Sequence, residues 1–366
     1  MAGWLGVAGE RDFRMRKRLR GLAWIFLKMN RLWFFVVVGV FPVGSLILHG
    51  VIFLCYARRW DEVTALTVFP FWAWGVAGIG LAGFAWLITR RRFPLAVVGI
   101  WVVTVLVYSD GTRPVLRSLK PGPEMGKPAP AAGGSPVLRV ITFNCRAGYY
   151  NRSAPREVIA WEPDVVLLQE TSPRVVLEEV AKELYGGNPA EHVVAGPQCG
   201  IITRGRILSG FPAKWSNAVL AVIQFGDGSL LQVASVHLRG AETDVRLYKR
   251  EALSKHARNR QARRAELRKI LASPQLVDRQ VPSLVGGDFN APAGDAIFRL
   301  MESAGFSDAM AEAGSGWPDT YPNAAPLLRI DYQWFGDRMH PVRGRTVKSV
   351  HSDHRMVVVD YVVEQG

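Results

Sequence analysis

Three long apolar stretches in the first third of the chain constrain its fold more than any other feature. Residues 32–57 and 64–89 are each 26 residues long, and only His49 interrupts the first of them. Residues 93–108 form a third, uncharged stretch of 16 residues. A transmembrane helix needs about 20 apolar residues, so the first two stretches can each cross a bilayer, and the third is either a short span or a re-entrant segment.

The succession of these stretches favours membrane insertion over the alternatives. A buried helical hairpin of a soluble protein seldom presents three charge-free stretches with Trp and Tyr near their ends. A cleaved signal peptide has an apolar core of only about 7–15 residues and is not followed by a second span. We therefore predict a transmembrane region at 32–108 with about three helices.

The distribution of charge predicts the orientation of this region. Residues 1–108 carry a net charge of +9 out of the total of +14, so most of the basicity belongs to the apolar end and says little about nucleic acid. Cations are dense in residues 1–31 and 90–92, whereas residues 58–62 hold two cations beside two acids. The positive-inside rule places the basic N-terminus in the cytoplasm. With three spans, the protein is a multi-pass protein of the plasma or inner membrane, and everything after Tyr108 is extracytoplasmic.

A change of composition separates the apolar region from a soluble domain. Residues 110–136 contain six prolines and five glycines, which predicts an extended, flexible linker at 109–136. The soluble domain is predicted at 137–366. Cys145 and Cys199 lie in it, and we expect two free buried thiols in preference to a disulfide.

The soluble domain alternates strand-like and helix-like runs, which predicts an α/β fold with at least six strands. A long basic helix is expected at 244–272 and shorter helices at 155–161 and 173–184. The expected strands are 137–144, 164–170, 200–203, 218–223, 230–238, 284–289, 330–335 and 355–362.

The stretch G-G-D-F-N-A-P at 286–292 has the outline of an active-site turn. Its two glycines allow a tight turn after a buried strand. Asp288 and Asn290 are two residues apart and so point the same way. The alternative is a plain turn leading to a helix that begins near Gly294.

Other predicted strands also end in polar residues. Because open sheets assemble their sites along one edge of their strands, such a set favours a shared site. The residues are Asn144, Gln169, Glu170, His237, Asp331, Asp353 and His354.

The ordered set T-F-N, L-L-Q-E-T, V-H-L, G-D-F-N, R-I-D-Y and S-D-H-R resembles the endonuclease/exonuclease/phosphatase superfamily, across residues 137–363. That superfamily includes deoxyribonucleases, abasic-site endonucleases, inositol-polyphosphate phosphatases and sphingomyelinases. The resemblance implies a four-layer α/β sandwich of the deoxyribonuclease type and hydrolysis of phosphate esters.

The resemblance also implies a divalent metal site. Oxygen ligands favour Mg²⁺, with Mn²⁺ as an alternative, and the lack of a Cys/His cluster argues against zinc. Glu170 is the expected principal metal ligand, and Asn144 is expected to bind the metal or to orient Glu170. Asp353 is assigned to the metal or to the attacking water.

The remaining residues of the set are expected to act on water and phosphate. Asp288 would orient and deprotonate the attacking water, and Asn290 would donate to a phosphoryl oxygen. His354 would contact the phosphate from the other side with Asp331 as its partner. His237 is expected to bind a phosphate oxygen; the alternative is a core histidine bonded to backbone.

Some residues are weaker candidates for substrate binding. Arg146 stands where some nucleases of the family carry a carboxylate. Because an arginine cannot bind a metal, this predicts a single metal site. Arg146 would then either clamp a phosphate or lie on the surface. Trp317 and Tyr321 could stack on a base, enter lipid or pack on the sheet. Arg329 is a further candidate. The basic helix could follow nucleic acid or anionic lipid, but a solvated face is the favoured interpretation.

The sequence therefore predicts a membrane-anchored, metal-dependent phosphoesterase, in the first place an endonuclease/exonuclease-type hydrolase. The alternative is a phosphodiesterase or phosphatase of lipids or small molecules, and the third hypothesis is a tethered binding module without catalysis. The expected partners are a nucleic acid or a lipid head group and the membrane itself, with no protein partner.

Overall fold

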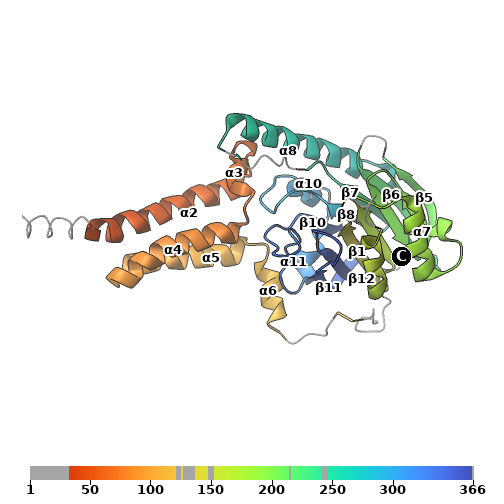
Figure 1. Cartoon of the computed structure of the whole chain (residues 1–366), viewed down its shortest axis with the longest axis horizontal. Helices are drawn as coiled ribbons and strands as arrows, with labels where there is room; N and C mark the ends of the chain where they lie inside the picture. Colours follow the sequence, from red (N-terminus) through yellow and green to blue (C-terminus); the bar gives the residue numbers. More distant parts are fainter. Residues whose placement is uncertain are drawn as a thin grey trace, which may run out of the picture. The chain divides into compact units, whose positions relative to one another are not determined.

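The computed structural model describes residues 33–120, 125–126, 137–146, 152–213, 216–240, 246 and 248–364 (Figure 1). The described chain divides into two compact units. Residues 33–54 and 72–107 make up what we call the anchor unit. Residues 55–71 and 108–364 make up the sandwich unit.

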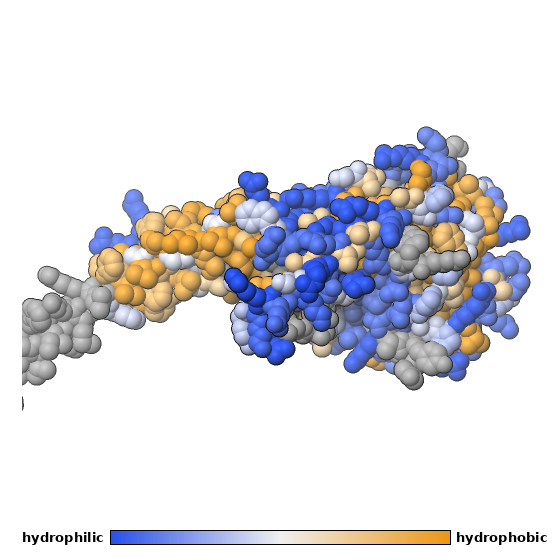
Figure 2. Space-filling model, turned by 90° about the horizontal axis from the view of Figure 1, so that it is seen from above, coloured by the Kyte–Doolittle hydropathy of each residue, from blue (hydrophilic) through white to orange (hydrophobic). Residues whose placement is uncertain are grey.

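The anchor unit contains three apolar helices. The first runs over Trp33–Arg58 and consists of a π-helical segment, η1 (Val36–Val40), followed by α2 (Phe41–Arg58). It and α4 (Phe71–Thr89) are long and apolar enough to cross a membrane, and α5 (Arg92–Tyr108) is followed after a sharp bend by α6 (Thr112–Ser118). Figure 2 shows hydrophobic side chains over most of the visible face of these helices.

Polar contacts and small residues join the three helices of the anchor unit. Ser45 Oγ donates to the carbonyl of Gly78 over 2.8 Å and accepts from Trp101 Nε1 over 3.0 Å. His49 Nε2 lies 2.9 Å from Thr104 Oγ1. A side chain on Gly78 would overlap the Trp101 ring, so the glycine permits this close helix packing.

The sandwich unit is built on two six-stranded sheets. The first has the order β11-β12-β1-β2-β4-β3 and the second the order β5-β6-β7-β8-β10-β9. Their strands are β1 (Val137–Asn144), β2 (Val165–Gln169), β3 (Val193–Ala195), β4 (Cys199–Thr203), β5 (Arg206–Pro212), β6 (Ala218–Gln224), β7 (Leu230–His237), β8 (Ser283–Asp288), β9 (Ser307–Asp308), β10 (Asp331–Phe335), β11 (Met339–Val347) and β12 (Met356–Val363).

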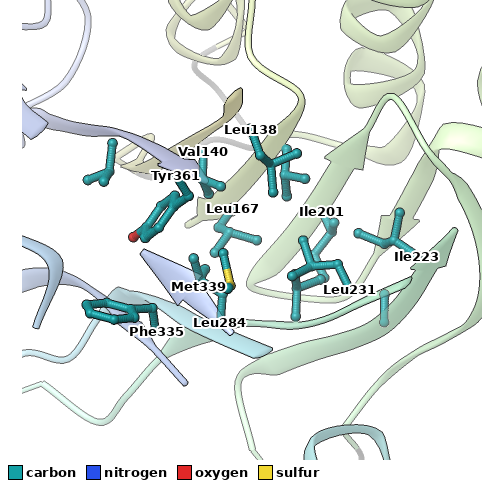
Figure 3. Packing of buried hydrophobic residues seen from close by; sticks show 14 of the residues in the cluster. Leu138, Val140, Leu167, Ile201, Ile223, Leu231, Leu284, Phe335, Met339 and Tyr361 are labelled. Carbon is teal, nitrogen blue, oxygen red and sulfur yellow. The ribbon is translucent and has the colours of Figure 1, made fainter. Parts of the chain in front are cut away.

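Helices cover the outer faces of both sheets. The helical segments of the sandwich unit are η2 (Asp61–Val63), α3 (Thr64–Thr67), α6, η3 (Ala154–Trp161), α7 (Arg174–Tyr185), η4 (Pro189–His192), α8 (Arg250–Leu271), α9 (Pro274–Val277), α10 (Phe298–Ser303) and α11 (Ala309–Ala313). Three apolar layers hold the assembly together. The central layer lies between the sheets and includes Leu167, Leu284 and Tyr361 (Figure 3). One outer layer packs the first sheet against α7, and the other packs the second sheet against α8 and α10. The predicted four-layer α/β sandwich is confirmed.

The structure corrects three boundaries. The second apolar helix begins at Phe71 and not at residue 64, because Pro70 separates it from α3. The predicted linker contains α6, whose Arg117 donates to the carbonyls of Ala311 (2.7 Å) and Gly314 (3.2 Å). The helix expected near Gly294 begins at Phe298.

The cysteines of the sandwich unit agree with expectation. Cys145 and Cys199 are buried thiols that are not joined in a disulfide.

Candidate active site

Strand register brings the predicted polar residues to one edge of the two sheets. In the second sheet, antiparallel pairing sets Asp331 of β10 opposite Asp288 of β8, and parallel pairing sets His237 of β7 beside Asp288. In the first sheet, β1 and β2 are parallel, so Asn144 pairs with Gln169 at the end where Glu170 follows. The site is therefore formed where both sheets end.

Gly287 allows β7 and β8 to approach closely at this edge. Its φ of +152° is one that other residues rarely adopt, and a Cβ there would lie 1.9 Å from the carbonyl oxygen of Val236. The glycine before Asp288 is thus required by the packing that sets His237 beside Asp288.

Asp288 is held by two donors at the centre of the site. Its Oδ2 accepts from Asn144 Nδ2 over 2.9 Å, and its Oδ1 accepts from the backbone N–H of Asn290 over 2.8 Å. Burial and the nearby charge of Asp331 raise the pKa of Asp288 to about 6, against the lowering effect of His354 and His237. The carboxylate is consequently fixed in orientation and more basic than a solvated aspartate.

Asn144 links Asp288 to Glu170. Its Nδ2 also donates to Glu170 Oε1 over 3.2 Å, while its Oδ1 accepts from the backbone N–H of Arg146 over 2.9 Å. The amide thus holds Glu170 and Asp288 in fixed positions relative to each other, while its oxygen keeps a second lone pair. Glu170 sits at a left-handed φ of 47°, and its side chain is 30% exposed where that of Asp288 is 2% exposed.

His237 faces both acids. Its Nε2 lies 3.9 Å from Glu170 Oε1 and 3.9 Å from Asp288 Oδ2. The ring thus points into the site, which argues against the alternative of a core histidine bonded only to backbone.

His354 and Asp331 form a buried pair. His354 Nδ1 donates to Asp331 Oδ2 over 2.9 Å. Burial lowers the pKa of His354, but the Asp331 carboxylate outweighs it and raises that pKa to about 9. One ligand atom from each of Asp288, Asp331 and His354 lies within 4.8 Å of the others, so these three residues form one cluster.

Two residues of one loop support the pair. Thr320 Oγ1 donates to Asp331 Oδ2, and the ring of Tyr321 lies 4.9 Å from that of His354. Tyr321 thus packs against a site residue, a contact that was not among its predicted alternatives. Thr320 was not foreseen from the sequence, because it stands in an irregular loop where no strand pattern marks it.

Asn290 lies beside Asp288 at a left-handed φ of 49°. Its Nδ2 donates to the carbonyl of Leu238 over 3.0 Å. An amide nitrogen carries two hydrogens, so this bond orients the amide while one hydrogen can still be donated. Its backbone carbonyl accepts from Arg263 of α8.

Asp353 and Arg146 lie at the exposed rim. Arg146 Nε is 3.6 Å from Asp353 Oδ2, and the side chains are 65% and 34% exposed. The turn that carries Asp353 is fixed by Ser352, whose Oγ donates to the Asn144 carbonyl (2.7 Å) and accepts from the His354 N–H (3.1 Å). Sequence analysis assigned no role to Ser352.

Other predictions need correction or remain as they were. Arg329 is buried, pairs with Asp308 and stacks on Tyr332, so these contacts give it a role in the fold. Trp317 is 40% exposed and donates Nε1 to the Pro326 carbonyl. The favoured interpretation of α8 as a solvated face is wrong for Arg260 and Arg263, which are buried.

The oxygen-rich end of the site fits a hard divalent cation. Glu170 and Asp288 offer carboxylates, and Asp331 Oδ1 is buried without a hydrogen-bond partner among the described residues. Mg²⁺ prefers such oxygen ligands and keeps several waters, so partial exposure at Glu170 suits it.

Comparison with solved structures finds chains of similar architecture. An endonuclease/exonuclease/phosphatase from Beutenbergia cavernae is 18% identical, with a TM-score of 0.45, over 62% of this chain and 72% of that chain. One from Bacteroides vulgatus is 17% identical, with a TM-score of 0.46, over 62% and 99%. Humanized D. rerio TDP2 is 20% identical, with a TM-score of 0.45, over 62% and 98%.

A search of curated proteins found no match. The profile of the family described as "Endonuclease/Exonuclease/phosphatase family" matches residues 141–354, which is more than half of the chain and contains the whole candidate site. The chain belongs to the endonuclease/exonuclease/phosphatase family.

Proposed function

We propose that this protein is a membrane-anchored, divalent-metal-dependent phosphoesterase that hydrolyses phosphodiester or phosphomonoester bonds. One observation carries the proposal: Asp288, Asp331 and His354 converge within 4.8 Å, with Asn144, Glu170 and His237 beside them. A binding module without catalysis would have no need of this complete set.

Asp288 is proposed to act on the attacking water. Two donors fix the orientation of its carboxylate, and the lone pairs that remain can orient a water and accept its proton. Asn290 then contributes its remaining amide hydrogen to a phosphoryl oxygen, where the bond strengthens as negative charge develops.

His354 acts from the opposite side of the phosphate. Because its Nδ1 donates to Asp331, the ring presents Nε2 to the substrate. His237 lies between the two acids and is suited to contact a further phosphate oxygen.

Glu170 would hold the metal, with Asn144 orienting it and Asp353 reaching it from the rim. A bound Mg²⁺ would neutralise charge on the phosphoryl oxygens and on the leaving oxygen.

The composition of the sandwich unit supports the proposed membrane topology. Residues 55–71 and α6 both belong to that unit, one before α4 and the other after α5. Since both lie on the same side of the membrane, the chain crosses an even number of times between them. If α4 crosses, α5 must cross too. Its 17 residues extend about 25 Å, which is short but sufficient in a thin or locally thinned bilayer.

Three spans with a cytoplasmic basic N-terminus place the sandwich unit outside the cytoplasm. A C-terminal alkaline phosphatase fusion should therefore be active and a C-terminal green fluorescent fusion dark. The reverse pattern would put the sandwich unit in the cytoplasm.

Two substrate classes compete. The family contains nucleases, and an exposed part of α8 is still basic, which supports nucleic acid. A lipid or small phosphate ester is favoured by one observation: the chain segments that emerge from the membrane belong to the same compact unit as the site.

A single assay separates these classes. The full-length protein is reconstituted in vesicles and given DNA, RNA, phosphoinositides, sphingomyelin and a bis-phosphoester, with and without EDTA. Nuclease activity should fall steeply with salt, whereas lipid hydrolysis should depend on the lipid content of the vesicles. The absence of EDTA-sensitive hydrolysis of every substrate would refute the proposed function.

A further inference from the structure

The segment that connects the first two apolar helices is tied to helix α8 by an ion pair. We call residues Cys55–Phe71 the inter-span segment. Asp61 accepts from Arg264 with both carboxylate oxygens, over 2.8 and 2.5 Å, and its Oδ1 lies 3.6 Å from Arg260 Nε. A bidentate arginine–carboxylate pair fixes orientation as well as distance.

The same helix carries this connection to the active site. Arg260 Nε and Arg263 NH2 each lie 2.9 Å from Asp295 Oδ2. Arg263 NH1 also donates to the backbone carbonyl of Asn290. A continuous set of contacts therefore runs from Asp61 through α8 to Asn290.

The charges nearest the turn are almost fully buried, whereas the side chains of Asp61 and Arg264 are 14% and 16% exposed. The side chains of Arg260, Arg263 and Asp295 are 5%, 3% and 2% exposed. Buried charges are costly unless they are paired, so the three arginines need both Asp295 and Asp61. Without Asp61, one carboxylate would face three guanidinium groups, and their repulsion would act on the turn that contains Asn290.

Backbone packing places the inter-span segment against this turn as well. A Cβ on Gly294 would lie 2.9 Å from the carbonyl oxygen of Thr67. Arg299 NH2 donates to the carbonyl of Ala57 over 2.7 Å. The inter-span segment thus packs behind residues 290–299 at more than one point.

We propose that Asp61 is a positioning residue of the active site: through Arg260, Arg263 and Asp295 it holds the turn that presents Asn290. This inference rests on the proposed function, since Asn290 is assigned there to the phosphate. On this proposal the inter-span segment contributes to catalysis by positioning Asn290, in addition to connecting the two spans.

The test compares Asp61→Asn with Glu62→Gln in the full-length protein. Glu62 is the neighbouring acid, is exposed and undergoes the same change of charge. Asp61→Asn should lower kcat by about tenfold with KM within about twofold, because a displaced Asn290 loses contact mainly with the transition state. Glu62→Gln should match wild type, and Asp61→Glu should recover most of kcat.

Hydrogen exchange tests the inference independently of activity. Amides of residues 288–296 should exchange faster in Asp61→Asn and in Arg264→Gln than in wild type and Glu62→Gln. Unchanged exchange, or a kcat for Asp61→Asn equal to that of Glu62→Gln, would overturn the proposal. If wild type hydrolyses nothing, the proposed function fails, and the exchange result alone still decides whether Asp61 holds the turn.

Discussion

Asp331 accepts hydrogen bonds from two side chains, and these bonds fix the tautomer and the orientation of His354. One carboxylate oxygen accepts from His354 Nδ1 and from Thr320 Oγ1. The pair is buried, so solvent does not compete with it. The imidazole therefore keeps one tautomer and one orientation toward the pocket.

We expect Asp288→Ala and His354→Ala each to lower kcat by at least about a hundredfold, the usual scale for a lost general base or charge-stabilising donor. Steady-state kinetics on the best substrate measures this. Asp337→Ala and His340→Ala change the same residue types at exposed positions and should leave kcat unchanged. Near-normal turnover in either site variant would remove its assigned role.

Thr320→Val should lower kcat by about tenfold, since it removes the hydroxyl that helps to fix Asp331 but keeps the shape of the side chain. Thr320→Ser keeps the hydroxyl and should retain most of the activity. If the two variants behave alike, the hydroxyl does not matter for His354.

At the scale of elements, the predictions that succeeded concern strands with strong periodicity. Asp288 could be predicted to meet His237 and Asp331, because each stands at or next to the end of a buried strand and such ends converge. The short strand β9 and the 3₁₀ turns have too few residues for a periodic signal.

The buried arginines of α8 mark the limit of sequence analysis. Arg260 and Arg263 look like their exposed neighbours in the sequence, and their burial depends on Asp61 and Asp295, which are distant in the chain. Arg329 was likewise named as a candidate for substrate binding, and its pairing with Asp308 is visible only in the structure. Partners that come from irregular segments cannot be found from spacing alone.

The loop that carries Thr320 also contains a titratable carboxyl group, that of Asp319. Burial, and then the charge of Asp110, raise the pKa of Asp319 from 3.8 to about 7, although Arg329 and Arg355 oppose this. The folded carboxyl therefore holds its proton more tightly than the unfolded one, so the free energy of unfolding falls as pH rises from about 4 to about 7.

Asp319→Asn should reduce this pH dependence. The melting temperature of the variant should drop less than that of wild type between about pH 5.5 and about pH 8, because the amide cannot ionise. Differential scanning fluorimetry of the detergent-solubilised protein measures it, with Asp337→Asn as the exposed control. An equal drop in variant and wild type would show that Asp319 does not titrate in this range.

At the scale of the whole molecule, metal binding should increase the free energy of unfolding. A ligand that binds only the folded protein at about 100 times its Kd adds about 2.7 kcal/mol to the free energy of unfolding. Mg²⁺ should therefore raise the melting temperature of wild type and have little effect on Glu170→Gln. Glu191→Gln, at an exposed glutamate, should respond as wild type does. A Mg²⁺ response that survives in Glu170→Gln would exclude Glu170 as a ligand.

The pairing of Asp61 with Arg264 has a consequence for how the protein is made. Asp61 leaves the ribosome about 200 residues before its partner. If the apolar helices insert into the membrane as proposed, helix α8 would complete its folding against a segment that is already in place when α8 is made. A recombinant fragment that starts at residue 137 lacks Asp61 and the segment around it. Its inactivity would therefore say nothing about the chemistry of the full-length protein.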